Sequence, residues 1–236
     1  MFSTIDQPDL IRGIFAQIKE NIRSGSLKKG DALPSERELA ATFGVSRNTL
    51  REAIKSLQLI GLIECVQGAG NYVSTNLSHS LSEPFSVMFM LEDGSAGDIL
   101  QFRQAIEIVA ARHAAVCLTD GDISTLDVLA VQMSLETEPK AISDLDTLFH
   151  LSIIEHTANP LIITMMNAAE VLVEEQIYAA RVNLMSDRDA LSQINAQHRK
   201  LLDTFRAHDP DGSVAAITDH LEFVKDYMLP LTDKRV

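Results

Sequence analysis

The chain has 236 residues, of which 46% are hydrophobic and 22% are charged, and its formal net charge is −13. This length and composition suit a soluble globular protein with a sizeable core, and the two cysteines, Cys65 and Cys117, exclude a disulfide framework and fit a reducing compartment. The sequence has no signal-peptide pattern and no uncharged apolar run of the roughly 20 residues that span a bilayer, so we expect a cytoplasmic protein with no membrane contact.

The charge is divided unevenly along the chain. Residues 1–75 hold 9 Lys or Arg and 8 Asp or Glu, a balance of +1, whereas residues 76–236 have a balance of −14. Such an asymmetry indicates two domains with different partners, and an acidic domain repels nucleic acid from its own surface. We expect a first domain over residues 1–75, a linker over 76–94 and a second domain over 95–232.

Three helices are predicted in the first domain. Apolar residues recur at every fourth position within residues 9–24, which is typical of an amphipathic helix. Ser35, with Glu38 three residues later, has the spacing of a capping box and marks the start of a second, short helix. Ser46 is the expected N-cap of a third helix, which covers residues 47–60 and ends at a glycine.

A hairpin is expected after the third helix. Residues 62–74 carry strand-forming residues around a Gly-rich turn at 67–71, and this pattern predicts a two-stranded wing. Together with two short helices joined by a Gly-containing turn, it predicts a winged helix-turn-helix. Gly68, next to Gln67 at the tip of the wing, would allow a close approach to a DNA backbone.

The start of the third helix is where we expect DNA to be read. Arg47, Asn48, Thr49 and Arg51 crowd its first turn, from which side chains can reach base edges and phosphates. Arg47 and Arg51 project together, and a guanidinium fork matches the O6 and N7 acceptors of guanine. The alternative is a protein-interaction module of the same shape with solvated arginines.

The segment between the domains is expected to be a connection, because residues 75–84 are rich in Ser and end in Pro84. The apolar residues 85–91 indicate a short docking helix after it. The second domain is predicted to be an all-helical antiparallel bundle, since short breaks separate segments with helical apolar spacing. These segments are residues 96–118, 120–135, 141–156, 160–184, 187–208 and 210–229.

Several polar residues lie on apolar faces of these predicted helices. Asp146 and His150 are four residues apart and point within about 40° of each other beside an apolar stripe. His198 and His220 each lie on an apolar face of a later helix. A buried unpaired carboxylate or imidazole is costly, and a divalent metal (zinc, nickel or manganese) bound by these four residues would offset that cost. The alternative for each histidine is a hydrogen-bonded core residue.

Arg103 also lies on an apolar face, with Glu107 four residues later. One interpretation is an ion pair within the helix. The other is a guanidinium that binds the carboxylate of a small organic acid next to the metal. Arg181 and Asn195 are further candidate effector contacts at the same end of the bundle.

The first domain closely resembles the GntR family of bacterial transcription factors. The resemblance rests on motifs in residues 33–40, 44–53, 61–63 and 68–70. It implies DNA contacts by Arg37, Arg47, Arg51 and the wing around Gly68, and contacts to phosphates or bases by Ser46, Asn48 and Thr49. Gln67 at the wing tip is a departure from the family pattern and puts the minor-groove contact there in doubt.

The second domain is similar to the ligand-binding domain of the FadR subfamily, known as the FCD type. The matching positions are residues 102–111, Asp146, His150, residues 159–160, His198 and His220. The resemblance implies an all-helical domain with a metal at Asp146, His150, His198 and His220, a carboxylate effector at Arg103, and a homodimer.

These observations together predict a transcriptional repressor whose dimer binds an inverted-repeat operator in double-stranded DNA and responds to a small carboxylate or sugar acid. One alternative is a metal sensor, for which the ion itself is the signal. The other is a metal-dependent hydrolase with Glu107 as the general base, although the sequence has no HExxH motif. We expect no enzymatic activity.

Overall fold

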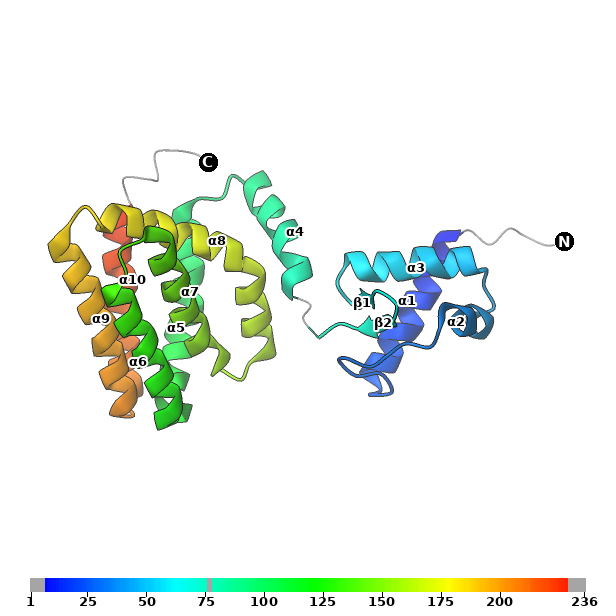
Figure 1. Cartoon of the computed structure of the whole chain (residues 1–236), viewed down its shortest axis with the longest axis horizontal. Helices are drawn as coiled ribbons and strands as arrows, with labels where there is room; N and C mark the ends of the chain where they lie inside the picture. The colour runs from blue at the N-terminus through cyan, green and yellow to red at the C-terminus, as the bar shows by residue number, and fades with distance from the viewer. Residues whose placement is uncertain (1–6, 76–77, 229–236) are drawn as a thin grey trace. The chain divides into compact units, whose positions relative to one another are not determined.

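The computed structural model of the chain describes residues 7–75 and 78–228, which divide into two compact units over residues 1–83 and 84–236. Over residues 7–75 the first unit contains three helices and one hairpin: α1 (Gln7–Arg23), α2 (Glu36–Phe43), α3 (Arg47–Leu59), β1 (Ile63–Val66) and β2 (Gly70–Val73). The strands pair antiparallel, with Ile63 opposite Val73 and Val66 opposite Gly70. The predicted winged helix-turn-helix is therefore present (Figure 1).

The helix starts in this unit follow from local capping. The backbone N–H of Glu38 donates to Ser35 Oγ at 3.3 Å and the Ser35 N–H donates to Glu38 Oε2 at 3.0 Å, so the predicted capping box is confirmed. Gly44 ends α2 in the left-handed conformation at φ 65°, which favours glycine. Apolar side chains of α1, α2, α3 and the hairpin form one core, including Ile14, Leu50 and Ile63.

The region expected as a linker is mostly helical. The helix α4 (Ser78–Leu91) covers most of it and contains Pro84, and Phe85 packs against the core of the second unit. The apolar residues after Pro84 thus belong to a longer helix than their pattern alone predicted. Leu91 at its end is largely exposed.

The second unit is the predicted all-helical antiparallel bundle (Figure 1). Its helices are α5 (Ala96–Cys117), α6 (Asp120–Leu135), α7 (Pro139–Glu155), α8 (Pro160–Leu184), α9 (Arg188–Arg206) and α10 (Pro210–Met228). α5 packs against α7, α8 and α10, and α9 packs against α6 and α10. Four fully buried alanines let other helices approach α5 closely: Ala110, Ala111, Ala114 and Ala115.

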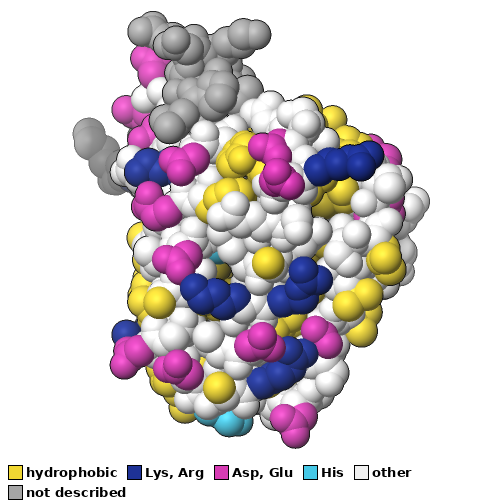
Figure 2. Space-filling model, turned by 90° about the vertical axis from the view of Figure 1, so that its left-hand side faces the viewer, with side chains coloured by type: hydrophobic (Ala, Val, Ile, Leu, Met, Phe, Trp, Pro, Cys, Tyr) yellow, Lys and Arg dark blue, Asp and Glu magenta, His cyan; other side chains and the backbone are white. Residues whose placement is uncertain are grey.

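The surface of the bundle mixes charges of both signs. On the face drawn in Figure 2, Lys and Arg side chains lie among Asp and Glu side chains. Ion pairs join neighbouring helices, as between Lys200 and Asp219 at 2.8 Å and between Arg206 and Asp127 at 3.0 Å. None of the described helices is long and apolar enough to cross a membrane.

Candidate functional site

The start of α3 presents several of the predicted DNA contacts to solvent. Arg47, Asn48 and Arg51 are exposed on its first turns, as is Arg37 on the first turn of α2. Thr49 differs, because only 9% of it is exposed and its backbone N–H donates to Ser46 Oγ at 3.1 Å. Ser46 and Thr49 therefore fix the start of the helix that presents the arginines.

Arg51 is held by the preceding helix. Its Nε donates to Glu36 Oε2 at 2.7 Å, so α2 and α3 are joined by an ion pair that the sequence did not predict. This contact engages Nε, and no hydrogen bond joins either terminal nitrogen of the guanidinium to Glu36 in the described structure. The terminal fork is the part of arginine that pairs with guanine.

The tip of the wing has the backbone geometry that glycine permits. Gly68 has φ 79°, a backbone conformation that favours glycine. A Cβ at this position would meet no atom within 4 Å, so glycine is required by the conformation and not by crowding. Gln67 and Gly68 are both exposed. They can approach another molecule without rearrangement of the hairpin.

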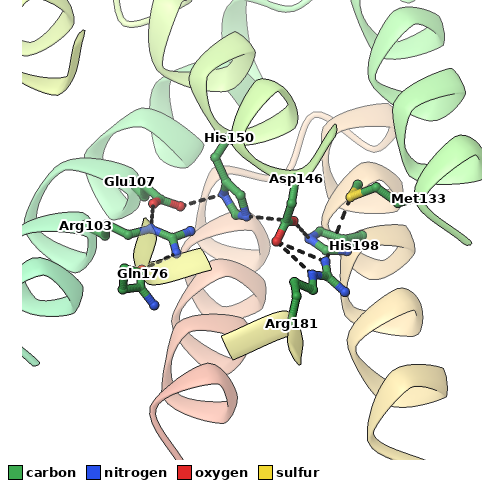
Figure 3. A network of polar contacts seen from close by, with 8 residues as sticks. All are labelled: Arg103, Glu107, Met133, Asp146, His150, Gln176, Arg181 and His198. Atoms are coloured by element: carbon green, nitrogen blue, oxygen red, sulfur yellow. Dashed lines mark hydrogen bonds and ion pairs between the residues drawn. The ribbon is translucent and has the colours of Figure 1, made fainter. Parts of the chain in front are cut away.

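A cluster of buried polar side chains, together with the thioether of Met133, lies at the centre of the helical unit (Figure 3). It draws residues from all of the helices α5 to α10. The members are Arg103, Glu107, Met133, Asp146, His150, Gln176, Arg181, His198 and His220. The periodicity of the sequence correctly placed Asp146 and the three histidines on inward faces.

The three predicted histidine ligands meet. Each of His150, His198 and His220 offers one ring nitrogen, and these nitrogens all lie within 4.8 Å of one another. Asp146 Oδ1 is 3.1 Å from His198 Nε2 and 3.6 Å from His150 Nε2. This donor set, three imidazoles and a carboxylate, is one that zinc and other divalent first-row metals bind.

Arg181 holds the other oxygen of Asp146. Its Nε donates to Asp146 Oδ2 at 3.0 Å, and its Nη2 lies 3.0 Å from the same atom (Figure 3). Oδ1 is thus left facing the histidines. Arg181 was predicted as an effector contact; the structure gives it a carboxylate partner within the protein, and an effector contact by Arg181 stays a prediction.

Glu107 lies between Arg103 and His150. Its Oε1 accepts from Arg103 Nε at 2.6 Å, and its Oε2 is 2.6 Å from His150 Nδ1. Arg103 also donates through Nη1 to Gln176 Oε1 at 2.9 Å. The ion pair within α5 is therefore present. The sequence did not reveal the contacts to His150 and Gln176, because periodicity does not say which helices face each other.

Burial and charge set the protonation of the cluster. Burial alone would raise the pKa of Glu107, but Arg103 and His150 outweigh it and lower this pKa to about 2. Burial would also raise the pKa of Asp146, but the neighbouring Arg181 and His198 hold this pKa well below its ordinary value. Burial lowers the pKa of His198 and lowers that of His220 further. At neutral pH the carboxylates are ionised and these two imidazoles are neutral, the forms that bind metal.

Unpartnered atoms mark the centre of the cluster. They are Asp146 Oδ1, both ring nitrogens of His150, both of His198, and Nδ1 of His220, none of which has a hydrogen-bond partner among the described residues. Close approaches such as that between Asp146 and His198 do not have hydrogen-bond geometry. Each buried unpartnered polar atom costs about 1–3 kcal/mol. A cation bound by one atom of each residue would remove much of that cost, so the residues present fit a metal.

Two further features share no hydrogen bond and no lining residue with this cluster in the described part of the chain. Asn195 is half-buried, and no hydrogen bond joins it to any described residue of the cluster, so its effector contact stays a prediction. A surface groove of about 540 Å³ lies between α9 and α10, with Lys200, Asp219 and Phe223 among its lining residues. None of the candidate metal ligands lines this groove.

Exposed arginines lie on a helix of a winged helix-turn-helix, and a second, all-helical unit has a buried polar centre. These features are those of a DNA-binding regulator. Comparison with known proteins identifies the family. The sequence pattern of "Bacterial regulatory proteins, gntR family" matches residues 10–73, and that of the "FCD domain" matches residues 98–223. The chain belongs to the GntR family and carries an FCD domain. It is a DNA-binding transcriptional regulator, and not an enzyme.

Relatives are similar over nearly the whole chain. The "Putative L-lactate dehydrogenase operon regulatory protein" of Escherichia coli is 31% identical, over 90% of this chain and 83% of its own. The regulator LutR of Bacillus subtilis is 29% identical, over 88% of this chain and 95% of its own. The Glc operon transcriptional activator of Escherichia coli is 29% identical, over 88% of this chain and 84% of its own.

A solved structure supports the fold. Streptococcus agalactiae GntR superposes with a TM-score of 0.69, at 23% identity, and the match covers 92% of this chain and 99% of that one. The family matches and the relative at 31% identity confirm the resemblance to the GntR family and to the FadR subfamily.

Proposed function

We propose that this regulator senses a small carboxylate at a divalent metal that His150, His198, His220 and Asp146 Oδ1 bind. The observation that carries the proposal is the group of unpartnered ring nitrogens and carboxylate oxygen at the centre of the helical unit. When bound, the metal would supply a Lewis-acidic centre for the oxygen atoms of a ligand. Arg181 keeps Asp146 turned toward the histidines through its two nitrogen contacts.

Charge balance favours an anionic effector. Arg103 and Arg181 offset Glu107 and Asp146, so the buried cluster is close to neutral when its imidazoles are neutral. A divalent ion adds two positive charges away from water, where uncompensated charge is costly. A carboxylate offsets that charge, and the buried Nη2 of Arg103, which has no hydrogen-bond partner among the described residues, is a donor for it.

The name of one relative suggests a chemical class for the effector. The Escherichia coli relative at 31% identity is named for an L-lactate dehydrogenase operon. We propose a small hydroxycarboxylate, which offers both a carboxylate for Arg103 and a hydroxyl oxygen for the metal. For regulation, this ligand must bind one conformation of the protein more tightly than another, with a typical coupling of about 1–3 kcal/mol.

Metal content is the first test. Replacing both His198 and His220 by Ala should abolish stoichiometric uptake of Zn²⁺, Ni²⁺ and Mn²⁺, measured by elemental analysis after dialysis. His113→Ala is the matched control, because His113 is exposed on α5 and apart from the cluster. Undiminished metal in the double variant would place the site elsewhere and overturn the assignment.

Titration calorimetry of the zinc-loaded protein with L-lactate and other small hydroxy acids tests the effector. We expect binding that Arg103→Met weakens at least tenfold and that Arg112→Met leaves unchanged, since Arg112 is an exposed arginine of the same helix paired with Asp211. If chelation abolished DNA binding while no organic acid altered it, the ion itself would be the signal.

We further propose repression as the sign of regulation, because a protein bound over a promoter blocks transcription by occupancy. The name of one relative is that of an activator, so the sign needs its own measurement. Deleting this regulator should raise expression of a reporter under the bound promoter. A fall in expression would contradict repression and would leave the ligand site untouched.

A further inference from the structure

Glu107 divides its two oxygens between an arginine and a candidate metal ligand. Oε1 accepts from Arg103 Nε at 2.6 Å, and Oε2 lies 2.6 Å from His150 Nδ1. All three side chains are almost completely buried, so water does not compete for these contacts. A carboxylate fixed by an arginine on one side is thereby presented to the imidazole on the other (Figure 3).

The ring of His150 is bracketed by two carboxylates. Its Nδ1 faces Glu107, and its Nε2 faces Asp146 Oδ1 at 3.6 Å (Figure 3). Nδ1 and Glu107 Oε2 are close but not aligned for a hydrogen bond, and neither atom has another hydrogen-bond partner among the described residues. The χ2 torsion of histidine is soft, so a small rotation of the ring aligns the two.

The position of one proton decides what this ring can do. An imidazole has one N–H and one lone pair when it is neutral. A carboxylate at Nδ1 accepts a hydrogen bond only if the proton is on Nδ1, and the lone pair is then on Nε2, toward Asp146 and His198. A carboxylate partner of this kind fixes the orientation of a metal-binding histidine and makes it a better ligand.

We propose that Glu107 is the positioning residue of the metal site: it holds the proton of His150 on Nδ1 and presents Nε2 to the ion, while Arg103 fixes Glu107. This inference rests on the metal site proposed above. Among the described residues, Glu107 forms its hydrogen bonds and ion pairs with Arg103 and His150. Its part is therefore indirect, and it is distinct from the general-base role considered from sequence.

Zinc affinity is the first readout, measured on the full chain by competition with a chromogenic chelator. Glu107→Ala should weaken Zn²⁺ binding by about 10–100-fold, as loss of such partners does. The zinc affinity of Glu107→Gln should lie between those of wild type and Glu107→Ala, since its amide oxygen can still accept from Nδ1 without the negative charge. The control is Glu155→Ala, which removes an exposed carboxylate at the end of the helix that carries His150; its zinc affinity should stay within about threefold of wild type.

A second readout separates positioning from a general loss of stability. Long-range ¹H–¹⁵N spectra of the metal-free protein report which nitrogen of His150 carries the proton, with the signal assigned through His150→Gln. Wild type should show the proton on Nδ1, and Glu107→Gln should show a mixture. If Glu107→Ala does not fold, the Gln variant and its spectra carry the test, with its thermal unfolding as the check on folding.

The outcomes are distinguishable. Wild-type zinc affinity in both Glu107 variants, or a His150 ring whose protonated nitrogen is the same with and without Glu107, would overturn the positioning role and leave the metal site standing. Wild-type protein that takes up no Zn²⁺ would overturn the metal site itself, and this inference with it.

Discussion

At the scale of single residues, Glu36 is expected to control how Arg51 reads DNA. Its carboxylate holds Arg51 Nε at 2.7 Å and leaves the terminal fork free for guanine. Glu36→Gln should therefore reduce discrimination between a selected site and one with the contacted guanine replaced by up to about fivefold, which corresponds to the roughly 1 kcal/mol that a partly exposed ion pair contributes at most. Affinity for random DNA should rise, because the variant removes a negative charge near the phosphates. Binding isotherms on sites selected with the wild-type protein measure both quantities.

Glu52→Gln is the matched control for that experiment. Glu52 lies on α3 next to Arg51 and pairs with Lys55 at 3.1 Å rather than with Arg51. It should raise affinity for random DNA in the same way and leave discrimination unchanged. Equal behaviour of the Glu36 and Glu52 variants would show that only net charge matters and would refute the positioning of Arg51.

At the scale of the helices, sequence periodicity was a good guide to faces and a poor guide to partners. It placed Asp146, His150, His198 and His220 inward, because polar residues at helical spacing within apolar stripes have no other direction. It could not show that Arg181 faces Asp146, 35 residues earlier, or that Gln176 faces Arg103, 73 residues earlier. Those contacts depend on how α8 packs against α5 and α7, which no local pattern encodes.

The capping residues were equally local and equally predictable. Ser35 and Ser46 lie directly before α2 and α3, where their side chains satisfy backbone N–H groups that the helix leaves free. The helix α4 was less predictable, because Ser-rich composition and Pro84 favour a connection while the apolar residues around them favour a helix. Packing of Phe85 against the core favours the helix, and that contact is tertiary.

The buried imidazoles of α9 and α10 make the stability of the helical unit depend on pH. His198 and His220 both have pKa values below the ordinary 6.5 because of burial. The unfolded chain then binds more protons below about pH 6.5, so the free energy of unfolding should fall as the pH drops from 7 to 5. The contribution of these neutral histidines to the free energy of unfolding is fully present above about pH 6.5. It is lost as the pH falls toward their pKa values in the folded protein, by up to about 1.4 kcal/mol per pH unit for each histidine. Glu107 and Asp146 act in the same direction in more acidic solution.

Denaturant unfolding of the chelator-treated protein between pH 5 and 8 measures this dependence. His220→Gln should flatten the curve, since it removes the group whose pKa is lowered further. His113→Gln should leave it unchanged, because that histidine is exposed. A curve of the same slope in the His220 variant would show that the acid sensitivity comes from other groups.

At the scale of the whole molecule, the charge distribution restricts how DNA can be bound. The balance of −14 over residues 76–236 repels DNA from the helical unit, and basic groups on the face drawn in Figure 2 are interspersed with acidic ones. Affinity must therefore come from the first unit, whose balance is only +1. A single such unit reads few bases, and each good arginine contact contributes about 1–3 kcal/mol of discrimination.

That shortage leads to the prediction of a homodimer on an inverted repeat. Two copies double the number of base contacts, and two-fold symmetry of the protein requires matching symmetry of the operator. Light scattering should give about twice the chain mass of 26.0 kDa at the concentrations used for binding. Scrambling one half of a selected operator should weaken binding by about 100-fold or more, since it removes several contacts of about 1–3 kcal/mol each. Scrambling the bases outside both halves is the control and should have little effect. A monomeric mass together with equal affinity for half and whole operators would contradict the dimer, because a monomer uses only one half at a time.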